Sequence, residues 1–187
     1  MSPGNYPTFL QALKLIGLYV LIAIPINLIG AFLLSDEMLQ MLVVYVASLT
    51  IIIFIGYRKK AALEGRIKLL YSRAGNIYMT ASVVIAAASM PFFLDPVYSI
   101  LPKTWLDEFA DREFARVIQP NVLSFLAIVI APAILEELFF RGIILDGFIG
   151  VYKTRKAILL SALLFGLIHL NIQQFFAGFT IGLLIGW

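Results

Sequence analysis

The chain has 187 residues, of which 61% are hydrophobic and 13% charged, and its formal net charge is +3. Soluble domains are typically about 45–50% apolar, so this composition excludes an ordinary water-soluble domain. The basic residues lie between apolar segments, so we interpret the positive charge as a membrane-topology signal and predict no nucleic-acid partner. Cysteine is absent from the sequence, which excludes disulfides, thiolate metal ligands and a cysteine nucleophile.

Long apolar segments recur along the chain. A helix that crosses the hydrocarbon core needs roughly 20 apolar residues, and several segments here reach or approach that length. The sequence predicts helices over residues 9–34, 38–57, 76–94, 121–148, 157–170 and 175–187. We therefore predict an all-α fold, a polytopic transmembrane helical bundle that forms one membrane-embedded domain over residues 1–187.

The Lys and Arg residues are distributed unevenly between the predicted helices. Residues 58–73, which we interpret as a basic loop, hold six of them, and residues 153–156 hold three. The turn at residues 35–37 has none, and in residues 95–120 three are outweighed by five acidic residues. Because cytoplasmic loops are enriched in Lys and Arg, this distribution predicts that the amino terminus is cytoplasmic.

Three charged residues interrupt the interior of the fourth apolar segment, Glu136, Glu137 and Arg141, and a fourth, Asp146, lies close to its end. An Asp, Lys or Arg at mid-membrane costs roughly 2.5–3.5 kcal/mol on insertion scales, so intramembrane charges point to function. Glu137 and Arg141 are four residues apart and share a helix face, where they can form an ion pair. The alternative interpretation of this pair is a purely structural salt bridge.

Glu136 is rotated by about 100° from Glu137 on the predicted helix and has no such local partner. An unpaired carboxyl group in a low-dielectric site can hold or accept a proton near neutral pH, which is what a general base requires. Glu136 is therefore the first candidate catalytic residue.

His169 is the only histidine in the chain. If the fourth and fifth helices form an antiparallel hairpin, the midpoint between Glu136 and His169 falls at Tyr152 and Lys153, in a basic turn. Both residues then lie at similar depth, roughly 20 Å or more from that turn, where they can share a water molecule. The alternative interpretation of His169 is a buried structural residue.

Other hydrolytic mechanisms fit the sequence less well. It contains no H-E-x-x-H zinc motif. Ser161 precedes His169 by about two helical turns, which is too far for a serine–histidine pair. An aspartyl dyad needs two facing intramembrane acids, and Asp146 is the only intramembrane aspartate candidate. A water activated by glutamate and histidine remains as the peptidase hypothesis.

Two short motifs resemble those of a known family. Residues 136–142 read E-E-L-F-F-R-G, and residues 165–169 read F-G-L-I-H. They are similar to the E-E-x-x-x-R and F-x-x-x-H motifs of the CAAX-processing and bacteriocin-processing (CPBP, Abi-type) intramembrane peptidases. The resemblance implies that Glu136 and His169 are the catalytic pair, with Glu137, Arg141 and Phe165 in supporting positions.

The resemblance also bears on cofactors and on the length of the chain. Family members are described both as metalloproteases and as glutamic peptidases, so Glu136 and His169 become candidate ligands of a divalent metal such as zinc, with both mechanisms open. Members carry a later H-x-x-x-N or H-x-x-x-D motif, for which this chain has no further histidine. The resemblance therefore implies a chain cut within its sixth helix and inactive at this length.

Together, the residues and the resemblance predict an intramembrane endopeptidase that acts on a peptide or lipidated-protein substrate in the lipid bilayer. Glu136 would take a proton from water, and His169 would orient that water or stabilise the oxyanion. Two alternatives stay open. One is a proton-coupled membrane transporter in which Glu136 and His169 relay protons, and the other is a non-catalytic membrane scaffold or immunity protein.

Overall fold

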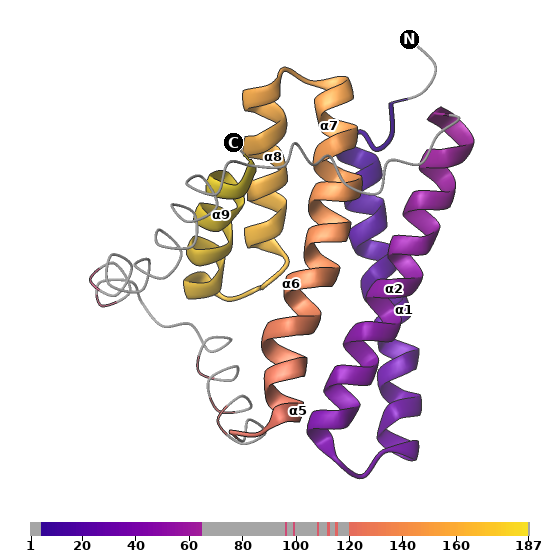
Figure 1. Ribbon diagram of the computed structural model, residues 1–187, viewed down its shortest axis with the longest axis vertical. Coiled ribbons are helices and arrows are strands. Elements are labelled where there is room, and N and C mark those ends of the chain that lie inside the picture. The colour runs from indigo at the N-terminus through magenta and orange to yellow at the C-terminus, as the bar shows by residue number, and fades with distance from the viewer. Residues whose placement is uncertain are drawn as a thin grey trace.

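The computed structural model describes residues 5–64 and 120–186, together with Pro96, Ser99, Glu108, Arg112 and Ala115. All elements in these ranges are helical (Figure 1), which confirms the all-α class. In chain order they are α1 (Phe9–Leu33), α2 (Glu37–Glu64), α5 (Val122–Phe125), η1 (Leu126–Ile130), α6 (Ala131–Glu136), η2 (Glu137–Leu145), α7 (Asp146–Val151), α8 (Thr154–Leu167) and α9 (Ile172–Gly186). The predicted helix 76–94 lies outside the described residues.

Among the described residues, three continuous helices are long and apolar enough to cross a membrane: Phe9–Leu33, Glu37–Glu64 and Val122–Val151. The third consists of α5, η1, α6, η2 and α7 joined end to end, and η1 and η2 are π-helical. At most 22% of the apolar window of each helix is buried inside the structure. Large apolar side chains such as Phe32, which is 90% exposed, therefore face outward, where lipid takes the place of water. This is an integral membrane protein.

The helices form two antiparallel pairs with the long third span between them (Figure 1). α1 and α2 turn at one end of the molecule, and α7 and α8 turn at the opposite end, where the amino-terminal segment also lies. Tyr152 ends α7 and Lys153 caps α8, so the hairpin turn falls where the sequence predicts it. The core between the pairs is formed by buried side chains of η2 and α7, including Phe140, Ile143 and Phe148.

The end of α2 differs from the prediction. The helix continues to Glu64, so Arg58, Lys59 and Lys60 are helical and do not begin a loop. The reason is that Lys60 is buried, with 1% of its side chain exposed, and its Nζ lies 3.3 Å from Glu64 one turn further along. Burial and this ion pair stabilise the additional turns.

The junction of the last two helices also differs from the prediction. α8 ends at Leu167, and α9 begins at Ile172, not at residue 175. Leu170 has a left-handed backbone conformation with φ 54°, which a helix cannot continue through. The side chain of Asn171 then accepts a hydrogen bond from the backbone N–H of Gln174 at 2.9 Å and caps the new helix.

Close packing of α8 against α9 follows from small residues on both helices. Gly178, Gly182 and Gly186 recur every four residues along α9, so they share one face. A Cβ atom added at Gly182 would lie 2.9 Å from Ala162, and one at Gly186 would lie 2.7 Å from Ile158. The two helices therefore approach closely, as small residues allow in membranes, and this holds the turn between them in place.

Candidate active site

Glu136 and His169 come to similar depth through a short returning helix. α8 has 14 residues and is about 21 Å long, less than the roughly 30 Å of the hydrocarbon core. His169 lies in the turn just after it. Glu136 lies about four helical turns, or about 22 Å, before the end of α7. Because α7 and α8 share one turn, both residues are at about the same distance from that end of the bundle.

The two residues line one cavity of about 440 Å³. Tyr45 and Gln174 are its other polar lining residues, and the rest of the wall is apolar, formed by side chains of α2, η1, α6, α8 and α9. Irregular backbone at membrane depth is tolerated where it lines a cavity or is buried in protein, and the turn that carries His169 is such a segment. The structure thus brings together the two residues that the sequence singled out.

Glu136 has a partner that the sequence does not suggest. The hydroxyl of Tyr45, on α2, donates a hydrogen bond to Oε1 of Glu136 at 2.7 Å. The expectation that Glu136 lacks a local partner holds for its own helix, but the partner comes from 91 residues away. Within the described ranges, Oε2 of Glu136 forms no hydrogen bond. The only sequence feature that could have indicated this partner is the phenol of Tyr45 in an otherwise apolar stretch of α2.

His169 is held by its own backbone environment, in a turn and not within a helix as predicted. Its Nδ1 lies 2.8 Å from the carbonyl oxygen of Phe165, and a carbonyl can only accept, so Nδ1 carries the hydrogen. In the neutral ring, Nε2 then has a free lone pair. The ring of Phe165 also packs edge-on against the imidazole, with centroids 5.3 Å apart. The geometry thus sets both the tautomer and the orientation of His169.

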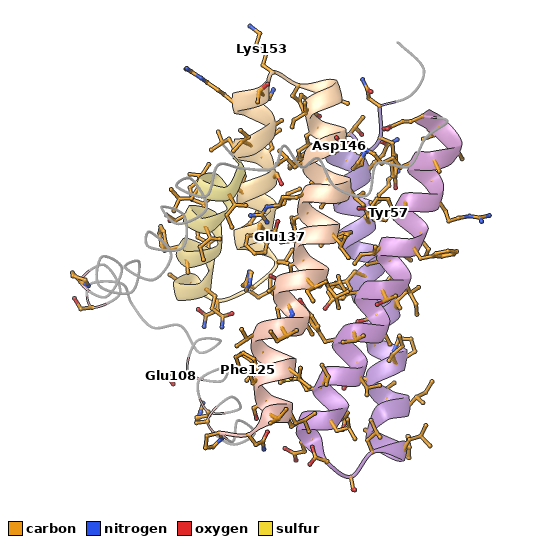
Figure 2. The ribbon with its side chains drawn as sticks, viewed as in Figure 1. Tyr57, Glu108, Phe125, Glu137, Asp146 and Lys153 are labelled. Carbon is orange, nitrogen blue, oxygen red and sulfur yellow. The ribbon has the colours of Figure 1, made fainter. Side chains whose placement is uncertain are left out.

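Glu137 and Arg141 form the ion pair that their spacing predicts, with Nη1 3.3 Å from Oε1. Figure 2 shows Glu137 on the side of the 122–151 helix that faces α8. The guanidinium of Arg141 also lies over the ring of Phe165, 5.0 Å from its centroid, and its buried Nη2 has no hydrogen-bond partner among the described residues. Phe165 therefore packs between Arg141 and His169, so one aromatic ring links the ion pair to the site.

The described residues supply only part of a metal site. No group of three or more His, Asp or Glu side chains among them is arranged to hold a metal ion. A catalytic zinc takes three protein ligands, whereas the cavity offers the carboxylate of Glu136 and the Nε2 lone pair of His169. The donor types are suitable for zinc, but their number is too small for a complete site.

The fold and the site define a class: a polytopic helical membrane protein with a carboxylate and an imidazole in one cavity at membrane depth. Residues 118–187, which include both motifs and the entire α8–α9 hairpin, match the family described as Rce1-like, type II CAAX prenyl endopeptidase Rce1-like. This match confirms the resemblance drawn from the two motifs, and over residues 118–187 the sequence is similar to CAAX-type intramembrane proteases. No curated protein and no solved structure matches the chain.

Proposed function

We propose that this protein is an endopeptidase that hydrolyses a peptide bond of a peptide or lipidated-protein substrate within the membrane, using water activated by Glu136 and His169. The observation that carries the proposal is that these two side chains, one on α6 and the other in the turn after α8, line the same cavity. The largely apolar wall of that cavity suits an apolar peptide segment or a lipid chain.

The proposed mechanism begins with a water between the two side chains. Oε2 of Glu136 accepts one hydrogen of the water, and the lone pair on Nε2 of His169 accepts the other. As the water oxygen attacks the substrate carbonyl, its proton passes to Glu136, which then protonates the departing amine. With Nδ1 bound to the Phe165 carbonyl, the neutral imidazole is an acceptor at Nε2, which favours the water-orienting role over donation to the oxyanion.

The test compares two adjacent carboxylates in the whole gene product. Glu136→Gln keeps the size of the side chain but removes the base, so it is expected to lower turnover by at least about 100 to 10,000-fold with little change in thermal stability. Glu137→Gln is the matched control. It leaves Arg141, whose Nη2 already lacks a partner, without its counter-charge, so it is expected to lower the melting temperature in detergent while the turnover per folded molecule is kept.

The measurements are peptidase turnover and melting temperature for both variants. A Glu136→Gln protein that still cleaves its substrate would rule out the proposed mechanism. If the unmodified protein has no peptidase activity and instead moves protons or a solute in a Glu136-dependent way, the transporter interpretation takes its place. Binding of a partner without turnover or transport would favour the scaffold or immunity role.

We also propose a topology for the protein. The amino-terminal segment, the basic end of α2 and the α7–α8 turn lie at one end of the bundle (Figure 1). Phe9 N donates a hydrogen bond of 3.3 Å to the Tyr152 hydroxyl, and Lys60 near the end of α2 donates one of 3.2 Å to the Tyr6 carbonyl. Because this end carries Lys153, Arg155 and Lys156, it is expected to be cytoplasmic. Reporter fusions at Lys153 and Asp36 should give signals from opposite sides, and an extracytoplasmic signal at Lys153 would reverse the topology.

A further inference from the structure

Tyr45 contacts the site from a helix that carries neither family motif. It lies on α2, near the middle of the second membrane span, and its side chain is half-buried. Its hydroxyl donates to Oε1 of Glu136 at 2.7 Å, an ordinary O–H···O hydrogen-bond distance. Residues 118–187 alone match the family model, so this contact lies between the matched region and an earlier part of the chain.

Tyr45 and Glu136 both line two cavities. Both line the 440 Å³ cavity that contains His169. Both also line a second cavity of about 30 Å³, whose remaining wall is Tyr19 and apolar side chains such as Phe139 and Phe140. A free glutamate side chain samples several rotamers. Here the hydrogen bond from Tyr45 favours the rotamer that keeps Oε1 within reach of the hydroxyl.

From this geometry, and resting on the proposed function, we infer that Tyr45 is a positioning residue for Glu136. Its hydroxyl binds Oε1 and so directs Oε2 toward the cavity, where the reacting water and Nε2 of His169 meet. When Oε2 accepts the proton of the water, Oε1 becomes the carbonyl oxygen of a carboxylic acid and can still accept from Tyr45. The orientation of Glu136 is therefore kept from proton abstraction until the proton is given to the leaving amine.

A positioning role and a purely structural role have different consequences. If the bond mainly joined α2 to α6, its loss would lower stability. If it mainly orients Glu136, its loss would lower kcat, since displacing a catalytic group by about 1 Å can cost about 100-fold in rate. Substrate binding would then be unaffected, because the substrate is held by the rest of the cavity wall. A lower kcat with unchanged KM and melting temperature therefore indicates the positioning role. A lower melting temperature indicates the structural role.

The experiment compares two variants, each of which loses the phenolic oxygen of one tyrosine on α2. Tyr45→Phe keeps the ring and removes the donor to Glu136. Tyr57→Phe is the matched control, because Tyr57 lies about three turns further along α2 and its hydroxyl approaches the Leu138 carbonyl of the same neighbouring helix at 3.5 Å. Both variants, with Glu136→Gln, are made in the whole gene product and assayed in detergent for kcat, KM and melting temperature.

We expect Tyr45→Phe to lower kcat by about 10 to 100-fold, with KM and melting temperature equal to those of Tyr57→Phe. A Tyr45→Phe protein with the kcat of the control, or with a loss of rate that only follows a loss of stability, would overturn the inference. If Glu136→Gln is inactive in the same experiment, the proposed function survives that failure. If Glu136→Gln remains active, the proposed function and the role of Tyr45 are both overturned.

Discussion

Two clusters of polar side chains in the described part of this helical bundle are satisfied in different ways. One is the cavity of Glu136 and His169, and the other is a buried cluster around Lys60 near the amino-terminal segment. In the cavity, one carboxylate oxygen of Glu136 is bound by Tyr45, and Glu136 and His169 line a space of about 440 Å³. Around Lys60, oxygen atoms of the protein surround the ammonium group.

The Lys60 cluster joins three parts of the chain. The ammonium group of Lys60 lies 2.6 Å from Oδ2 of Asp146 and 3.3 Å from Oε1 of Glu64, and it donates to the backbone carbonyl of Tyr6 at 3.2 Å. An ammonium group has three N–H donors, and each has an acceptor here. Figure 2 shows Asp146 on the side of α7 that faces α2 and the amino-terminal segment.

The difference between the groups lies in what each leaves available. A buried charge is tolerated when counter-charges and hydrogen bonds replace the water it has lost. The Lys60 cluster meets that condition within the described residues and offers nothing to a ligand. The cavity meets it only in part, because neither Oε2 of Glu136 nor Nε2 of His169 has a hydrogen-bond partner among the described residues. Polar groups that still lack hydrogen-bond partners can bind a substrate or water. A cluster whose groups are all paired can only stabilise the fold.

The largest effect on stability is expected from Lys60→Met. This change keeps an unbranched side chain of similar length but leaves the carboxylates of Glu64 and Asp146 together without a cation. Removing one partner of a buried pair typically costs about 3–5 kcal/mol, so the melting temperature should fall sharply. Turnover per folded molecule should be kept, because Lys60 lies about 22 Å along α2 from Tyr45.

Lys59→Met is the matched control for this change. Lys59 is exposed and lies over the ring of Tyr6, 5.7 Å from its centroid, so its loss should cost no more than about 1 kcal/mol. Thermal denaturation and turnover are measured for both variants. If Lys60→Met abolished turnover while the protein stayed folded, the separation between a structural cluster and a catalytic cavity would be wrong.

A smaller effect is expected where the amino-terminal segment covers the cluster. A Cβ atom added at Gly147 would collide with the backbone of Tyr6 and Pro7, and backbone atoms cannot move aside as a flexible side-chain end can. Gly147→Ala should therefore displace this segment and cost about 1–3 kcal/mol, as overpacking typically does. Limited proteolysis should then cut near residues 5–7 faster than in the unmodified protein.

Gly17→Ala is the comparison for that prediction. Nothing lies within 4 Å of a Cβ atom added at Gly17, and alanine is favoured over glycine inside a helix by roughly 0.5–1 kcal/mol. This variant should be at least as stable as the unmodified protein. Equal stability and equal proteolysis for the two variants would show that the amino-terminal segment does not close the Lys60 cluster.

The sequence by itself determined the properties that depend on composition and on neighbours along the chain. Apolar segments of spanning length are enough to establish a helical membrane protein, because lipid requires backbone groups to be satisfied within each segment. The ion pair of Glu137 and Arg141 follows from a spacing of four residues on a helix. The two motifs were enough to indicate the similarity of residues 118–187 to CAAX-type proteases. The hairpin turn predicted at Tyr152 and Lys153 was enough to place Glu136 and His169 at similar depth.

Only the tertiary structure decided which distant groups meet. The bond from Tyr45 to Glu136 and the burial of Lys60 against Asp146 join segments far apart in sequence, and no local pattern specifies such pairs. The Lys60 contacts also explain why α2 extends past residue 57. His169 was placed in a turn, and not in a helix, by the left-handed backbone at Leu170 and the cap at Asn171. Helical periodicity predicts which face a residue occupies, but which side chain of another helix lies opposite depends on how the helices pack.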